Sequence, residues 1–94
     1  MKIVNSKLYE EQLKSLLNEY FSKDLKGAKS FKLYLDTIIL NMPTKVKKYK
    51  QSIYFNNENI KDIEHQGLTI PFYYDIINNT YVILGIINNS SSNL

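Results

Sequence analysis

The chain has 94 residues, the usual length of one domain, and its 44% hydrophobic content excludes global disorder and provides for one modest core. It has no cysteine, which excludes a disulfide framework, a thiolate metal site and a cysteine nucleophile and fits a reducing cytoplasm. The net charge of +3 comes from twelve lysines and no arginine, so the side chain best suited to bidentate phosphate contacts is missing.

The sequence predicts a helical hairpin after a short β-prone segment at residues 2–4. The first helix, over residues 6–22, has apolar side chains at helical spacing: Tyr9, Leu13, Leu16, Leu17, Tyr20 and Phe21. The second helix, over residues 24–41, begins at a capping aspartate, Asp24, and ends before Pro43, which cannot continue the hydrogen-bond ladder. Because the turn between them is so short, the two helices should lie antiparallel and share one apolar side.

The second half of the chain has the alternation of β-strands. Residues 60–65 form one predicted strand, Gly67 a turn, and residues 68–74 a second strand, which Asn78 and Asn79 connect to a third strand over residues 81–87. In the second strand Pro71 has no N–H for a ladder, which indicates an edge position or a bulge. The fold class is therefore α+β, with the order β-α-α-β-β-β and the helical hairpin packed on a small antiparallel sheet.

The predicted core lies between the hairpin and the strand Tyr81–Ile87. The helix residues expected to pack there are Leu13, Leu17, Phe31, Leu35 and Ile38. Tyr74 shares its parity with Leu68, Ile70 and Phe72 and should face this core, while Tyr73 should face outward with Thr69 and Pro71. We expect one domain over residues 1–88 and a flexible polar tail over residues 89–94.

Several segments together resemble the RelE/ParE superfamily, the toxins of bacterial type II toxin–antitoxin pairs. They are Met42-Pro43, the lysine-rich stretch, Ser52–Phe55, Asn59–Asp62, Gly67–Phe72 and Val82–Ile86. The resemblance implies a compact sheet with the helical hairpin on one face. It also implies neutralisation by a cognate antitoxin whose flexible segment wraps the toxin in a hetero-oligomer.

Members of this superfamily differ in their targets. RelE-like toxins cut messenger RNA on the ribosome with basic and aromatic side chains on the sheet and near the C-terminus, whereas ParE-like toxins lack that set and inhibit DNA gyrase. This chain has no arginine, and after Tyr81 it has no titratable side chain. These departures favour a ParE-like toxin.

The densest basic patch lies just after the predicted second helix. It contains Lys45, Lys47, Lys48 and Lys50, with Tyr49 among them. Lysines interleaved with an aromatic ring form a candidate target- or nucleic-acid-binding surface. The same residues also read as a solvated loop in a lysine-rich sequence.

The candidate catalytic residues are His65, Lys48, Lys50 and Tyr73. His65 is the only histidine, and its unperturbed pKa suits proton transfer near neutral pH, although no second histidine completes an acid–base pair. A structural role is the alternative for His65, and ordinary sheet surface is the alternative for Tyr73. We expect no metal and no cofactor, since the sequence has neither a ligand cluster nor a glycine-rich phosphate loop.

The sequence therefore predicts a ParE-like toxin that acts by binding, with DNA gyrase as the expected target. One alternative is an enzyme, a RelE-like ribosome-dependent endoribonuclease. Another is a non-toxic relative that binds only its antitoxin. No apolar run approaches the roughly 18 residues of a membrane helix, and Met1–Asn5 lead into no apolar signal region, so we expect a cytoplasmic protein without a membrane partner.

Overall fold

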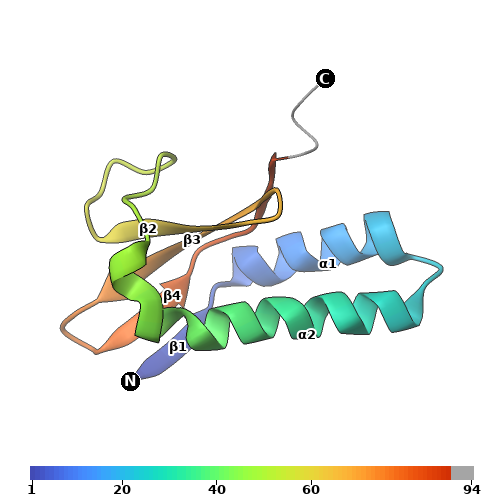
Figure 1. The fold of residues 1–94 in the computed structure, drawn as a ribbon, viewed down its shortest axis with the longest axis horizontal. Helices are drawn as coiled ribbons and strands as arrows, with labels where there is room; N and C mark the ends of the chain where they lie inside the picture. Colours follow the sequence, from blue (N-terminus) through green and yellow to red (C-terminus); the bar gives the residue numbers. More distant parts are fainter. Residues whose placement is uncertain (90–94) are drawn as a thin grey trace.

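The computed structural model describes residues 1–89 and has two layers, a helical hairpin and a sheet (Figure 1). The elements in chain order are β1 (Lys2–Asn5), α1 (Lys7–Phe21), α2 (Leu25–Asn41), the 3₁₀ helix η1 (Met42–Lys48), β2 (Ile60–His65), β3 (Leu68–Asp75), β4 (Thr80–Ile83) and β5 (Ile87–Asn88). Within residues 1–89 no helix has the length and apolarity needed to cross a bilayer.

The sheet is mixed, with the strand order β1-β4-β3-β2 and β5 paired to β3. β1 runs parallel to β4, whereas β2, β4 and β5 are all antiparallel to β3. The expectation of a purely antiparallel sheet is therefore wrong at β1. The physical reason is that the helical hairpin, β2 and β3 intervene before the chain returns to β1, so no tight turn imposes an antiparallel pairing.

Both helices begin at side-chain caps, of which the one at Asp24 was predicted from the sequence and the one at Ser6 was not. The hydroxyl of Ser6 accepts a hydrogen bond from the Tyr9 N–H at 3.1 Å, and the Asp24 carboxylate accepts one from the Gly27 N–H at 2.8 Å. These bonds satisfy N–H groups that have no partner inside the helix. α2 ends at Asn41, and the chain turns into η1 around Pro43.

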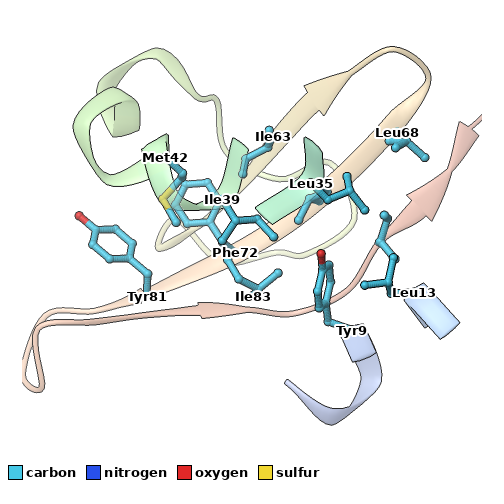
Figure 2. Close-up of a cluster of buried hydrophobic side chains, with 12 residues drawn as sticks. Tyr9, Leu13, Leu35, Ile39, Met42, Ile63, Leu68, Phe72, Tyr81 and Ile83 are labelled. Carbon is cyan, nitrogen blue, oxygen red and sulfur yellow. The ribbon is translucent and has the colours of Figure 1, made fainter. Parts of the chain in front are cut away.

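The core fills the space between the helices and one face of the sheet (Figure 2). Leu13 and Leu35 are buried there as predicted, and the exposed fraction of Leu35 is 0%. The other three predicted helix residues, Leu17, Phe31 and Ile38, are partly buried against this core. The cluster also contains buried residues from both helices, η1, β2, β3, β4 and the segment between β4 and β5: Tyr9, Ile39, Met42, Ile63, Leu68, Ile70, Phe72, Tyr81, Ile83 and Ile86.

The predicted strand over residues 81–87 is broken in the structure. β4 ends at Ile83, which is opposite Phe72, and β5 begins at Ile87, which is opposite Thr69. Three residues, 84–86, therefore stand opposite two residues of β3, Ile70 and Pro71. This extra residue has the character of a β-bulge. Pro71 lies in an inner strand and not at an edge, so of the two positions predicted for it the bulge is the one observed.

The first helix and its N-cap residue supply hydrogen bonds to the backbone of the bulge. The Leu84 N–H donates to the Pro71 carbonyl at 2.9 Å, but Pro71 has no N–H to return to Leu84. The Ser6 hydroxyl donates to the Leu84 carbonyl at 3.0 Å instead, and the Gln12 side-chain oxygen accepts from the Ile86 N–H at 2.9 Å. Gly85 permits this approach, because a Cβ there would lie 2.7 Å from the Gln12 oxygen.

Two turns connect the antiparallel strands. Gln66 and Gly67, both with positive φ, join β2 to β3 in the manner of a two-residue type I′ turn. Asn78 and Asn79 lie in the connection from β3 to β4, as predicted, and Asn79 also has a positive φ.

The segment between η1 and β2 rises on the side of β2 away from the two helices (Figure 1). The beginning of this segment pairs with β2, where the Ser52 N–H donates to the Ile60 carbonyl at 2.8 Å. Further along, the Tyr54 hydroxyl donates to the Asn89 side chain, whose amide nitrogen is 2.6 Å from the Thr69 hydroxyl. Asn89 was predicted to begin the polar tail and is hydrogen-bonded here, while residues 90–94 lie outside the described part of the chain.

Candidate functional site

The basic patch predicted from the sequence lies on η1 and the residues that follow it. All four of its lysines, Lys45, Lys47, Lys48 and Lys50, are exposed. Val46, between them, packs against the core, and its carbonyl accepts a hydrogen bond from the Lys61 ammonium at 3.1 Å. None of the four lysines forms an ion pair within residues 1–89. The ion pair found in this part of the chain joins Lys32 and Asp36.

Tyr49 anchors this basic segment to the core. Its ring meets the ring of Phe72 edge-on, with the centroids 5.7 Å apart and an interplanar angle of 80°. Burial raises the pKa of the Tyr49 hydroxyl above its ordinary value. Because its ring packs against Phe72, Tyr49 is half-buried. The sequence interpretation had instead placed it among the lysines as a surface aromatic.

Two carboxylates share a hollow with the end of the basic segment. The hollow has a volume of about 390 Å³ and is lined by Lys48, Tyr49, Lys50, Gln51, Ile53, Asp62 and Glu64. One oxygen of Asp62 accepts a hydrogen bond from the Ile53 N–H at 3.1 Å, and its other oxygen is buried without a partner. The hollow therefore combines positive and negative side chains, which makes it a weaker candidate for binding the phosphate backbone of a nucleic acid.

His65 lies apart from that hollow. Its ring contacts Tyr34 of α2 edge-on, and the Tyr34 hydroxyl lies 3.1 Å from Nε2 and 2.5 Å from Nδ1. Its alternating position on β2 matches that of the core residue Ile63, whereas Asp62 and Glu64 have the opposite parity. Of the candidate catalytic residues, the structure brings Lys48 and Lys50 together in one hollow and places His65 elsewhere.

Tyr73 occupies the sheet face opposite the helices. It pairs with Ile60 of β2 and Val82 of β4 and is half-buried. Tyr74 has the parity of the core, stacks on Tyr81 with centroids 4.6 Å apart, and packs against the buried cluster. The two tyrosines thus have the relative orientation that their alternation predicts. Within residues 1–89, no group of three or more His, Cys, Asp or Glu side chains could hold a metal ion.

A groove of about 530 Å³ runs between the two helices and the β2–β3 turn. Its lining is mainly apolar and aromatic and consists of Leu16, Tyr20, Phe21, Gly27, Ser30, Phe31, Tyr34, Gln66, Leu68 and Asn88. Phe21 and Phe31 face each other with centroids 5.3 Å apart. The His65–Tyr34 contact lies at the edge of this groove, because Tyr34 and the neighbouring Gln66 both line it.

The sequence interpretation missed this groove and the partner of His65. Tyr34 lies 31 residues before His65, and the helix periodicity gives no signal of a contact over that distance. Leu16 and Phe21 were recognised only as apolar positions of the first helix, and Phe31 was expected in the core. Their incomplete burial is a property of the tertiary fold, which spacing alone does not reveal.

The fold is similar to that of a solved structure over nearly its full length. That structure is the solution structure of the conserved hypothetical protein HP0892 from Helicobacter pylori, with a TM-score of 0.64, 21% sequence identity, and coverage of 98% of each chain. No protein-family model matches the chain. No curated protein matches it either. The similarity therefore concerns the fold, a small α+β domain with two helices on a mixed sheet.

Proposed function

We propose that this chain is the toxin of a bacterial type II toxin–antitoxin pair, that it is ParE-like, and that it acts in the cytoplasm by binding its target without cleaving a bond. The resemblance in sequence to the RelE/ParE superfamily supports the assignment of the chain to this class of toxins. DNA gyrase is the target that a ParE-like toxin implies.

The observation that carries the mechanism is the separation of His65 from the basic side chains. Cutting RNA requires a base for the 2′-hydroxyl, an acid for the leaving oxygen and cations for the developing charge. The ring of His65 is hydrogen-bonded to the Tyr34 hydroxyl. His65 is not among the residues that line the hollow containing Lys48 and Lys50. That arrangement favours a binding toxin over a RelE-like endoribonuclease.

The groove between the helices supports the proposal that the chain binds a protein partner. A mainly apolar, aromatic lining of this size suits the apolar face of a helix or an extended chain, which is how a flexible antitoxin segment would cover it. Tyr20, one of the residues that line the groove, is 49% exposed and can contribute to such a contact. We therefore assign the groove to the antitoxin and expect a hetero-oligomer.

Induced expression in a bacterial host tests the proposal. The chain should stop growth, and co-expression with the gene next to its own should restore growth and yield a stable complex. Purified chain should inhibit gyrase in a supercoiling assay. A chain that is harmless when expressed alone would indicate the non-toxic relative and contradict the toxin assignment.

A further inference from the structure

A second cavity lies along the helical hairpin, apart from the groove assigned to the antitoxin. Its volume is about 470 Å³, which is in the range of small-molecule pockets. Side chains of both helices line it, together with Asn5 at the end of β1, and it shares only Phe21 with the groove. We call it the Tyr9 cavity, after the most deeply buried residue of its lining.

Tyr9 brings to this cavity a hydroxyl group that lacks a hydrogen bond. The residue is 1% exposed, and its oxygen has no partner among residues 1–89. After burial, the charges that raise the pKa of this hydroxyl are those of Asp36 and Glu10. Both carboxylates line the same cavity, so the hydroxyl lies toward it. A ligand that reaches this hydroxyl would supply the bond that burial has removed.

We propose that the Tyr9 cavity binds a small neutral molecule with an apolar body and one hydroxyl group, which forms a hydrogen bond with the Tyr9 hydroxyl. The body would lie along the apolar side chains of the lining: Leu13, Leu17, Phe21 and Ala28. Leu17, Phe21 and Ala28 are only half-buried, so a ligand would remove their remaining apolar surface from water. This inference does not depend on the toxin assignment.

The charges around the cavity disfavour an anionic ligand. The described lining has two carboxylates and two ammonium groups, from Glu10, Asp36, Lys14 and Lys32, and therefore no net charge. A carboxylate placed at the Tyr9 hydroxyl would meet the negative charges that act there, Asp36 and Glu10.

A cationic ligand is disfavoured for a different reason. Lys32 already pairs with Asp36 at 2.8 Å, so a second ammonium group would have to compete for this carboxylate. It would also lose hydration beside a residue that is 1% exposed. A hydroxyl group carries no charge and can either donate to the Tyr9 oxygen or accept its proton.

The rim of the cavity favours a small molecule over a protein surface. Asn5, Asn18 and Ser22 line the cavity and are exposed, as are Lys14 and Glu10. Apolar contact is therefore confined to the inside of the cavity, whereas a protein partner is held by a contiguous apolar patch.

The direct test is an NMR titration of the methyl-¹³C-labelled chain with four probes of similar shape: benzyl alcohol, benzylammonium, benzoate and toluene. We expect benzyl alcohol to shift the methyl signals of Leu13, Leu17 and Ala28. It should bind about fivefold more tightly than toluene, because one hydrogen bond to a buried group contributes about that factor. Benzylammonium and benzoate should bind more weakly than benzyl alcohol by at least the same factor.

Tyr9→Phe separates the hydrogen bond from the shape of the cavity, because it removes the hydroxyl and keeps the ring. The affinity for benzyl alcohol should fall about fivefold, while that for toluene should stay within about twofold. A change in the shape of the cavity would instead weaken both probes alike.

Ala28→Leu tests the position of the ligand, because the larger side chain fills part of the cavity. It should weaken benzyl alcohol at least about tenfold, since it takes the place of the ligand's apolar body. The matched control is Ser30→Leu, which introduces the same side chain two residues further along α2 in the lining of the other groove. This variant should bind benzyl alcohol as the unmodified chain does.

Several results would overturn the inference. They are the absence of methyl shifts with every probe, equal or tighter binding of benzylammonium or benzoate, and shifts that map to Leu16 and Leu68 of the other groove. An equal effect of Tyr9→Phe on benzyl alcohol and toluene would also overturn it. Growth arrest is measured separately, so a failure of the toxin assignment leaves this titration unaffected.

Discussion

Replacing Ser6 with alanine should cost more than an ordinary helix cap, because its hydroxyl joins α1 to the sheet. The hydroxyl accepts from the Tyr9 N–H and donates to the Leu84 carbonyl, which has no donor from Pro71. Loss of the cap costs about 1 kcal/mol. Loss of the donor to a partly buried carbonyl adds about 1 kcal/mol. The free energy of unfolding should therefore fall by about 2 kcal/mol, equivalent to a Tm lower by about 8 to 16 °C for a domain of this size.

Three variants separate the two roles of this hydroxyl. Asp24→Ala removes an exposed cap that bonds the Gly27 N–H, so it should cost only about 1 kcal/mol. Ser6→Asp keeps a capping oxygen but has no proton for the Leu84 carbonyl, so it should remain destabilised. Ser6→Thr keeps both bonds and should stay within about 0.5 kcal/mol of the unmodified chain. Urea unfolding, followed by circular dichroism, measures the free energy of unfolding of these three variants and of Ser6→Ala. The reasoning is refuted if Ser6→Ala costs no more than Asp24→Ala.

Three further predictions concern the core, the pH dependence of stability and His65. Leu35→Ala should cost about 2 to 5 kcal/mol in urea unfolding because the side chain is fully buried, and a change below about 0.5 kcal/mol would place it outside the core. Burial, then the charges of Asp36 and Glu10, raises the pKa of Tyr9 to about 12, so the stability present below pH 10 should be lost between about pH 10 and 12. Tyr9→Phe should reduce that loss in unfolding measured against pH, and the remaining loss comes from the raised pKa values of Tyr49 and Tyr81. His65→Ala should leave growth arrest nearly intact, and its abolition in a variant that still folds would contradict the binding mechanism.

The helical hairpin and the direction of the strand side chains could be predicted from the sequence because they depend on local rules. The capping residue Asp24 marks where the second helix begins, and alternation places Tyr73 and Tyr74 on opposite faces. The parallel pairing of β1 with β4 could not be predicted in this way, since it is a contact between segments 78 residues apart at their first paired positions, Lys2 and Thr80. Periodicity contains no information on such a pairing.

The break between β4 and β5 has a partial signal in the sequence. Pro71 indicates an interruption in its own strand, and the structure places the extra residue opposite it, around Gly85. The bonds from Ser6 and Gln12 that satisfy this interruption come from α1 and its N-cap, and nothing in the strand sequence points to them. The candidate site follows the same pattern: the lysines are evident from composition, whereas the Tyr34–His65 contact and the exposure of Ile53 depend on the tertiary fold.

The proposed binding mechanism is tested most directly by primer extension on messenger RNA from cells whose growth the induced chain has stopped. We predict full-length transcripts in these arrested cells, because His65 is not placed with the lysines that cleavage would require. New 5′ ends within coding sequences that disappear with His65→Ala would contradict the account and identify the chain as an endoribonuclease.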